Sequence, residues 1–303
     1  MIKDKISVII PLYGDFDPRR TLLSVKSILN QKDINLEIVV SEQGKSPKLI
    51  CPPDPRVKHV FTAHDRSVAG DFNPGRVRNI GVAESDGEFL YTSDGDVVFM
   101  NPQYLSAGLG LLVENSKRAF KRPPMRRLPI ENFEEFLKCV ESCGIEFAIK
   151  SLDFGQEYLA TTDGKPRQLK VVQRDKGEYP KVFTTSIENF KKYCEDPFLK
   201  GQEPTIWSEN LHCGGNFLRR EHFDAVGGYC TFFLNWGCED SDLQWKVGEK
   251  YNLVFFPYTR EFEVLHLDHL KGYFSKEIWV RNEALENQRK LRGIDAAIME
   301  DKK

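Results

Sequence analysis

Apolar residues in the first third of the chain form short continuous runs, separated by stretches with helical spacing. Four of these runs predict strands: 6–12, 36–41, 57–62 and 88–92. Between them, residues 18–31 carry apolar side chains at helical intervals, and Asn73-Pro74 supplies a cap and a first-turn proline for a second helix. This alternation predicts right-handed βαβ crossovers and a mostly parallel sheet.

The middle of the chain lacks this regularity. Residues 151–182 are polar and poor in periodicity, so we interpret 106–210 as an insertion or lid with connecting segments. The basic stretch at 117–127 can contact phosphate, but a solvated charged face is the favoured interpretation. Regular patterns return after residue 211 and predict a short strand between glycine turns, a helix that begins near Glu239, strands at 252–256 and 262–267, and an amphipathic helix at 276–300.

Composition narrows the class of protein. The 303 residues are 40% hydrophobic and 29% charged, which suits one large α/β domain or two small ones. A net charge of −2 argues against nucleic-acid binding, and no apolar run approaches the roughly 20 residues of a membrane helix. The N-terminal apolar run is too short for a signal peptide and predicts a strand instead. The seven cysteines form no CxxC pair, so we expect reduced thiols in a cytoplasmic protein.

Two aspartates follow the strand predicted at 88–92, in the sequence SDGDV. Ligands of parallel sheets bind beyond the carboxyl ends of the strands, where Asp94 and Asp96 would lie. Two carboxylates one residue apart can hold a divalent cation together with substrate phosphates. Gly95 permits a turn and the close approach of a ligand. The alternative interpretation is an acidic turn, since Asp and Gly are common turn residues.

A second acidic cluster follows a tryptophan, in the sequence WGCEDSD at 236–242. An indole face can stack on a pyranose ring, and a carboxylate can accept the proton of an attacking hydroxyl. Acidic residues also favour helix N-termini, which can explain Asp240 and Asp242 but not Trp236.

Two histidines, His266 and His269, lie at the strand predicted at 262–267. Their odd spacing predicts that they face opposite sides of the strand, so that only one of them points at the site. A lone strand histidine is more often structural, but beside an Asp-x-Asp motif it is also a candidate third ligand for manganese.

Taken in order, five segments resemble glycosyltransferases of the GT-A fold, in or near family 2. They are SVIIPLYG, LEIVVSEQG, GRVRNIGVAESDGEFLYTSDGDV, CGGNFLRREHFDAVGGY and NWGCEDSDLQWKV. The last two resemble galactosyltransferase-like and chondroitin-polymerase-like members. The resemblance covers 1–105 and 212–270 and implies an α/β, Rossmann-like fold with a mostly parallel central sheet flanked by helices.

The same resemblance implies a division of the chain. Residues 1–105 would form the nucleotide-sugar-binding half of a single GT-A domain, and 106–210 the insertion or lid. Residues 211–275 would form the half that binds the acceptor and supplies a metal ligand, and 276–303 a C-terminal helix.

The roles that the resemblance implies fall into three groups. The donor site would contain Pro11, Tyr13, Glu42, Arg78, Asp94 and Asp96. The acceptor site would contain Trp236, Gly214, Gly215 and Glu239. Asp240 would be the catalytic base, with Glu239 holding acceptor hydroxyls, and Mn²⁺ or Mg²⁺ would bind Asp96 and His266, with His269 as the second choice.

The implied activity is metal-dependent transfer of a sugar, with inversion, from a UDP- or GDP-sugar to an acceptor hydroxyl of a carbohydrate or glycoside. The alternatives are a retaining transferase on the same scaffold, a nucleotidyltransferase, and a non-catalytic carbohydrate-binding module. The region after the first strand, YGDFDPRR, contains one glycine rather than the glycine-rich basic loop typical of nucleotidyltransferases. The sequence leaves the oligomeric state open.

Overall fold

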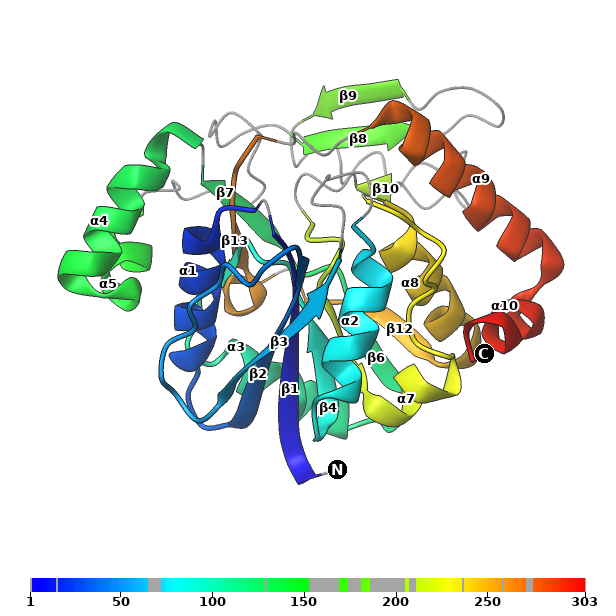
Figure 1. Cartoon of the computed structure of the whole chain (residues 1–303), viewed down its shortest axis with the longest axis horizontal. Coiled ribbons are helices and arrows are strands. Elements are labelled where there is room, and N and C mark those ends of the chain that lie inside the picture. Colours follow the sequence, from blue (N-terminus) through cyan, green and yellow to red (C-terminus); the bar gives the residue numbers. More distant parts are fainter. Residues whose placement is uncertain are drawn as a thin grey trace.

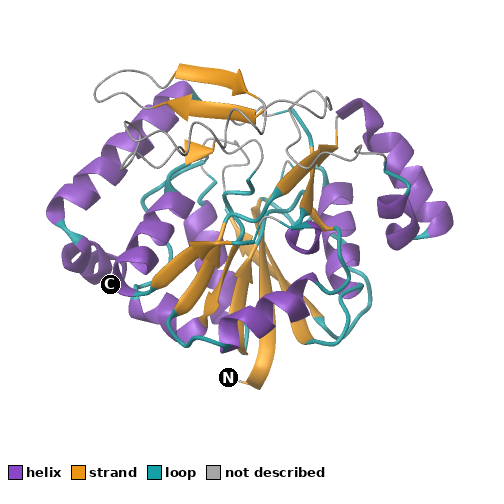
Figure 2. Cartoon of the chain, turned by 180° about the vertical axis from the view of Figure 1, so that it is seen from behind, coloured by secondary structure: helices purple, strands orange, loops and turns teal. Residues whose placement is uncertain are grey.

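A computed structural model describes residues 2–14, 16–64, 72–128, 130–152, 169–173, 181–185, 205–206, 211–235, 237–257, 259–270 and 275–302. Its centre is a seven-stranded sheet flanked by helices (Figures 1 and 2). In sheet order the strands are β12 (Asn252–Phe255), β6 (Arg118–Lys121), β11 (Asn216–Arg219), β4 (Gly87–Thr92), β1 (Ile2–Tyr13), β2 (Asn35–Gly44) and β3 (Val57–Ala63).

The central sheet is mostly parallel. Strands β3, β2, β1 and β4 pair in parallel, as do β12 and β6, whereas β11 runs antiparallel to both of its neighbours. The structure therefore confirms the predicted α/β class.

Helices cover both faces of the sheet. Successive side chains of each strand point to opposite faces and pack into two separate cores. In β1, Ile6, Val8 and Ile10 pack into one core and Ile9 into the other. The first core contains residues of α1 (Pro18–Leu29) and α3 (Tyr104–Val113). The second contains residues of α2 (Pro74–Ala83), α7 (Arg220–Ala225), α8 (Glu239–Lys250) and α10 (Ile294–Asp301).

The predicted start of α2 is confirmed. The side chain of Asn73 accepts a hydrogen bond from the Arg76 amide at 2.8 Å, and Pro74 occupies the first turn. The predicted C-terminal helix is instead two helices, α9 (Lys276–Arg292) and α10, because Gly293 has a φ of 90°. That backbone conformation suits glycine and ends a helix.

Two further small sheets complete the strands that the structure describes. One contains β5 (Val97–Phe99), β13 (Val264–Leu267) and β7 (Met125–Leu128), and the other contains β8 (Leu169–Gln173), β9 (Lys181–Thr185) and β10 (Thr205–Ile206). The segments η2 (Ile130–Asn132), α4 (Phe133–Cys143), α5 (Ile145–Lys150) and η4 (Arg260–Phe262) are helical.

The region 106–210 differs from the expected insertion where the structure describes it. Strand β6 belongs to the central sheet, and β7 pairs with β13 near the C-terminus. The basic stretch is not simply a solvated face, because Arg126 is 3% exposed and its Nε lies 2.8 Å from Glu263 Oε2. A buried guanidinium needs a charged partner, and Glu263 provides it for Arg126.

Two other properties follow from the described residues. None of their helices is long and apolar enough to cross a membrane. Six cysteines among them, including buried Cys230, are free thiols. Cys194 lies outside the described residues.

Candidate active site

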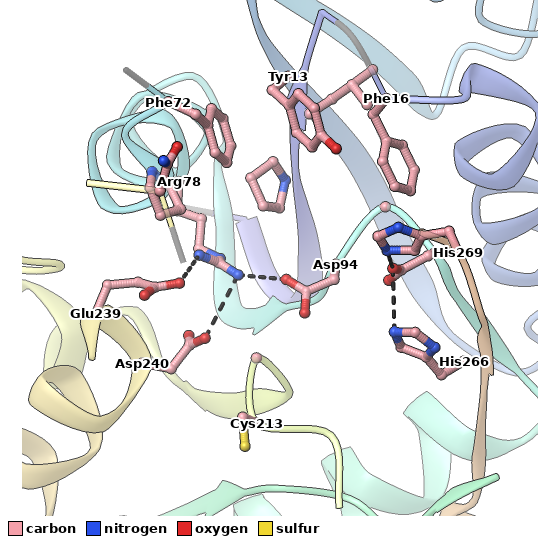
Figure 3. Close-up of a pocket in the computed structure, with 17 residues that line it drawn as sticks. Tyr13, Phe16, Phe72, Arg78, Asp94, Cys213, Glu239, Asp240, His266 and His269 are labelled. Atoms are coloured by element: carbon pink, nitrogen blue, oxygen red, sulfur yellow. Dashed lines mark hydrogen bonds and ion pairs between the residues drawn. The ribbon is translucent and has the colours of Figure 1, made fainter. Parts of the chain in front are cut away.

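A pocket opens beyond the C-terminal ends of the parallel strands β1 and β4 (Figure 3). The space inside it is about 890 Å³ when the open mouth is included. Most of the predicted site residues line it: Pro11, Tyr13, Arg78, Asp94, Asp96, Gly214, Glu239, Asp240, His266 and His269. The fold therefore brings together residues that are up to 258 positions apart in the sequence, from Pro11 to His269.

One wall of the pocket is aromatic. The ring of Tyr13 lies 5.5 Å from that of Phe16 and 5.3 Å from that of Phe72, measured between centroids. Phe16 in turn meets the His269 ring edge-on at 5.1 Å. Figure 3 shows these side chains along the same side of the pocket. Such a surface can stack against a flat, partly apolar ligand.

A second wall holds Asp96, His266 and His269. The Nε2 atoms of His269 and His266 lie 2.9 Å and 3.3 Å from Asp96 Oδ2. One ligand atom from each residue falls within a span of 4.8 Å. Burial alone would raise the pKa of Asp96, but the two histidines hold it well below its usual range. The Asp96 carboxylate is therefore ionised and close to two imidazole nitrogens.

This donor set suits a divalent cation. Asp96 Oδ1 is buried and has no hydrogen-bond partner among the described residues. A carboxylate and two imidazoles are common ligands of transition metals, and an unpartnered buried oxygen is costly unless something binds it. These three residues fit the metal that the sequence resemblance implies.

The expectation that only one histidine faces the site is wrong. The strand ends at Leu267, so His269 lies beyond it and side-chain alternation no longer applies. The chain leaves the strand, and His269 reaches Asp96 from the following loop.

Asp268 supports His266 from behind. Its Oδ1 lies 2.8 Å from His266 Nδ1, and Arg127 Nη2 lies 2.6 Å from the same oxygen. Burial would lower the pKa of His266, but Asp96 and Asp268 raise it to about 9. The contact with Asp268 orients the ring so that Nε2 faces Asp96, an arrangement common behind metal-bound histidines.

Glu239 and Asp240 form the third wall and begin helix α8. Both contact Arg78, which is 2% exposed: its Nη1 lies 3.3 Å from Glu239 Oε1 and its Nη2 lies 3.8 Å from Asp240 Oδ2. The Tyr229 hydroxyl donates to Asp240 Oδ1 at 3.1 Å. This contact fixes the direction of the Asp240 carboxylate.

Burial raises the pKa of both acids. It brings the pKa of Glu239 to about 8, with a further contribution from the Asp240 charge and an opposing one from Arg78. The pKa of Asp240 is raised by burial and lowered by Arg78, with a net upward shift. Two adjacent buried carboxylates share one guanidinium here, so at least one of them holds a proton readily.

The two aspartates of the SDGDV sequence point to different partners. Asp96 faces the histidines, whereas Asp94 lies 2.5 Å from Arg78 Nη2 and 2.9 Å from His212 Nε2. Burial would raise the pKa of Asp94, but Arg78 and His212 lower it. A single cation held by both aspartates does not match this geometry. His212, which is 3% exposed, was missed because nothing in its sequence neighbourhood distinguishes it from a structural histidine.

Two glycines of the CGGN sequence are required by packing. A Cβ atom on Gly214 would lie 2.8 Å from Asp94 Oδ2, and one on Gly215 would lie 2.5 Å from Pro123 Cδ. Gly214 lines the pocket, but Gly215 is not among its lining residues. Gly215 therefore acts through the close packing of the chain rather than at the pocket surface.

Glu42 is placed differently from the expectation. Its side chain is fully buried, accepts a hydrogen bond from the Lys48 amide at 2.8 Å, and lies 2.7 Å from His59 Nε2. It is not among the residues that line the pocket. The carboxylate holds the loop after β2, which accounts for an acid at the end of this buried strand. Trp236 lies outside the described residues.

Comparisons with known proteins point in one direction. Residues 200–270 match a family model described as the N-terminal domain of galactosyltransferase. A segment of 117 residues is 28% identical to an uncharacterized glycosyltransferase of Rickettsia bellii (strain RML369-C), and covers 37% of this chain. These segments of the chain are therefore similar in sequence to glycosyltransferases. The matched segment spans only 16% of the length of that relative.

Two solved structures resemble the chain more distantly. Mannosyltransferase PcManGT from Pyrobaculum calidifontis, in complex with GDP-Man and Mn²⁺, has a TM-score of 0.49 and 12% identity, over 98% of this chain and 68% of that one. TarS of S. aureus has a TM-score of 0.49 and 14% identity, over 95% and 40%. The family match at residues 200–270 includes four residues that line the pocket: Glu239, Asp240, His266 and His269.

Proposed function

We propose that the chain is a metal-dependent glycosyltransferase of the GT-A type that uses a nucleoside-diphosphate sugar as its donor. The observation that carries this proposal is one pocket with two kinds of acidic site. Figure 3 shows His266 and His269 on one side of it and Glu239 and Asp240 on the other. Asp96 lies with the two histidines. A transfer of this kind needs charge neutralisation at the leaving group and a proton acceptor at the nucleophile.

The charge of the pocket supports metal dependence. Asp94, Asp96, Glu239 and Asp240 all line it, and Arg78 is already in contact with three of them. A diphosphate would meet net negative charge unless a cation entered with it. When bound to Asp96, His266 and His269, Mn²⁺ or Mg²⁺ would neutralise developing charge on the leaving diphosphate. Two imidazole ligands favour Mn²⁺ over Mg²⁺, which prefers oxygen.

The rest of the donor would occupy the aromatic wall. Tyr13, Phe16 and Phe72 offer ring faces or edges for a nucleobase, and Pro11 continues this surface. Arg78, expected at the donor site, is a better candidate for holding Asp94 and the acid pair in place.

Asp240 is the proposed base for an acceptor hydroxyl. It lies at the N-terminus of α8, where the helix dipole favours the ionised form, and Tyr229 orients it. The pKa of Asp240 is raised, mainly by burial, and a carboxylate with a raised pKa is a stronger base. Glu239, whose pKa is about 8, is largely protonated at neutral pH and would hold acceptor hydroxyls. Because the acids and the metal residues lie on opposite sides of the pocket, attack from the face opposite the leaving group, with inversion, is proposed.

The test is turnover of UDP- and GDP-sugars, followed as release of nucleoside diphosphate, with and without Mn²⁺. We expect release that requires Mn²⁺ and is enhanced by a panel of glycoside acceptors. With a productive acceptor, NMR of the product anomer determines stereochemistry, and retention would overturn the Asp240 mechanism. Tight nucleotide-sugar binding without any turnover would instead favour a carbohydrate-binding module.

A further inference from the structure

A buried ionic network connects the two C-terminal helices to helix α8. Arg289 of α9 is fully buried, and its Nε and Nη2 lie 2.7 Å and 3.1 Å from the two oxygens of Asp242. The same guanidinium contacts Glu300 and Asp301, each at 2.6 Å. Lys246, also fully buried, forms an ion pair with Asp301. Two carboxylates and two cations are thus held together away from water, and the partly exposed Glu300 joins them from the edge.

This network approaches the proposed base by two routes. Asp242 is in the first turn of α8, two residues after Asp240. Lys246 donates to the Gly228 carbonyl at 2.6 Å, and the next residue is Tyr229, whose hydroxyl contacts Asp240. The position of the Asp240 carboxylate therefore depends on contacts made on the far side of α8.

Helix α9 also holds the loop that leads into α8. Asn282 is fully buried and donates from Nδ2 to the carbonyls of Leu234 and Gly237, at 2.7 Å and 3.2 Å. Its Oδ1 accepts from the Leu234 amide at 3.4 Å. The amide side chain thus joins the two described ends of the loop just before Glu239.

We propose that α9 is a positioning element for the acid pair, with Arg289 and Asn282 as its positioning residues. Neither residue lines the pocket. Arg289 sets the first turn of α8 through Asp242, and Asn282 sets the preceding loop. The proposal deepens the proposed function and rests on it for its consequence in catalysis. Arg289 and Asn282 contact adjacent segments from one helix. This role explains why a guanidinium and a polar amide occupy interior positions.

Catalytic geometry is sensitive to small shifts. A misplacement of about 1 Å that originates far from the chemistry can lower turnover by roughly a hundred-fold. A purely stabilising network would behave differently: its loss would increase opening of the whole fold and leave the geometry of the folded enzyme unchanged. These two roles can be separated by measurement.

The experiment compares two variants with two matched controls on the same helix. Arg289→Lys keeps the charge and removes the two-pronged contact with Asp242, while Arg292→Lys makes the same change at a half-exposed arginine that contacts Glu300. Asn282→Ala removes the loop contacts, while Asn287→Ala changes an exposed asparagine. Hydrogen exchange of peptides from 234–246 and from β1 is measured, together with calorimetric binding of UDP and GDP with Mn²⁺ and donor turnover.

We expect Arg289→Lys and Asn282→Ala to speed exchange in 234–246 but not in β1, and to lower kcat about ten- to hundred-fold. Nucleotide binding with Mn²⁺ should stay at the wild-type level, and both controls should match the wild type. Unchanged exchange in 234–246, or equal acceleration in β1, overturns the proposal. If Arg289→Lys does not fold, Asn282→Ala decides by the same criteria. If the wild type turns over no donor, the proposed function fails, while local exchange still tests whether α9 positions α8.

Discussion

Asp96 is buried and Asp240 is partly buried in the same pocket, but their surroundings differ. Asp96 is flanked by two imidazoles and its pKa is held low, whereas Asp240 is next to another carboxylate and its pKa is raised. The first environment favours a permanent anion with nitrogen ligands beside it. The second favours a carboxylate that can gain a proton. The two environments therefore suit different roles: that of Asp96 suits metal binding, and that of Asp240 suits proton transfer.

The largest effect is expected at the metal side. Asp96→Ala removes the charged ligand of the three, so it should abolish Mn²⁺-dependent binding of UDP or GDP, measured by calorimetry. Asp224→Ala, at an exposed aspartate of α7, is the control and should bind normally. Because His269 reaches Asp96 as closely as His266 does, alanine variants of both histidines should weaken binding. Unchanged metal-dependent binding in Asp96→Ala would show that Asp96 is not a ligand.

On the other side of the pocket, Asp240→Asn should lower turnover while leaving donor binding intact. The substitution keeps the shape and removes the basicity, and general-base catalysis contributes on the order of a hundred- to ten-thousand-fold in rate. The assay is nucleoside-diphosphate release at saturating donor, with Asp224→Asn as the control. Near-wild-type turnover in Asp240→Asn would show that Asp240 is not the base and would favour either Glu239 as the base or a retaining mechanism.

The local sequence predicts where the acidic residues of the pocket lie, but it does not predict which residues contact them. The strand before Asp96 and the helix that starts at Glu239 are visible as hydrophobic runs and turn residues. His212 and Arg78 approach Asp94 only after β11 joins the central sheet and α2 packs on it. Such long-range contacts depend on tertiary structure, which periodicity does not encode.

Two predicted positions show the limits of residue-by-residue transfer. Glu42 ends a predicted strand, as expected, but points to the loop after β2 and to His59. His269 lies past the end of β13, where strand alternation no longer decides its direction. A difference of one or two residues in a strand end therefore changes which side chains enter the site.

A smaller effect is expected at Asp268, which orients His266 without lining the pocket. Asp268→Asn should lower Mn²⁺ affinity about ten- to hundred-fold, as is typical for a partner of a metal ligand. Turnover at saturating Mn²⁺ should remain near wild type. Asp54→Asn, at another aspartate paired with an arginine, is the control. If Asp268→Asn and the wild type have equal Mn²⁺ affinities, measured by electron paramagnetic resonance, then Asp268 does not support metal binding.

A separate effect, outside catalysis, concerns stability and pH at the acid pair. The pKa of Glu239 is raised from 4.5 to about 8 on folding, mainly by burial. Between these values the folded protein binds more protons than the unfolded chain, so the free energy of unfolding should fall as pH rises. One proton accounts for at most about 1.4 kcal/mol per pH unit. Glu239→Gln should flatten this slope in urea unfolding measured between these pH values. Identical slopes would contradict a buried, protonated Glu239.

Donor binding through a cation at Asp96, His266 and His269 is the central claim. The most direct test is the melting temperature of the wild-type protein with UDP, GDP, Mn²⁺, and each nucleotide together with Mn²⁺. A ligand that binds the native state raises this temperature by mass action. The account predicts a clear rise for one nucleotide only when Mn²⁺ is also present, and no such rise in Asp96→Ala. An equal rise without Mn²⁺, or no rise with either nucleotide, would contradict it.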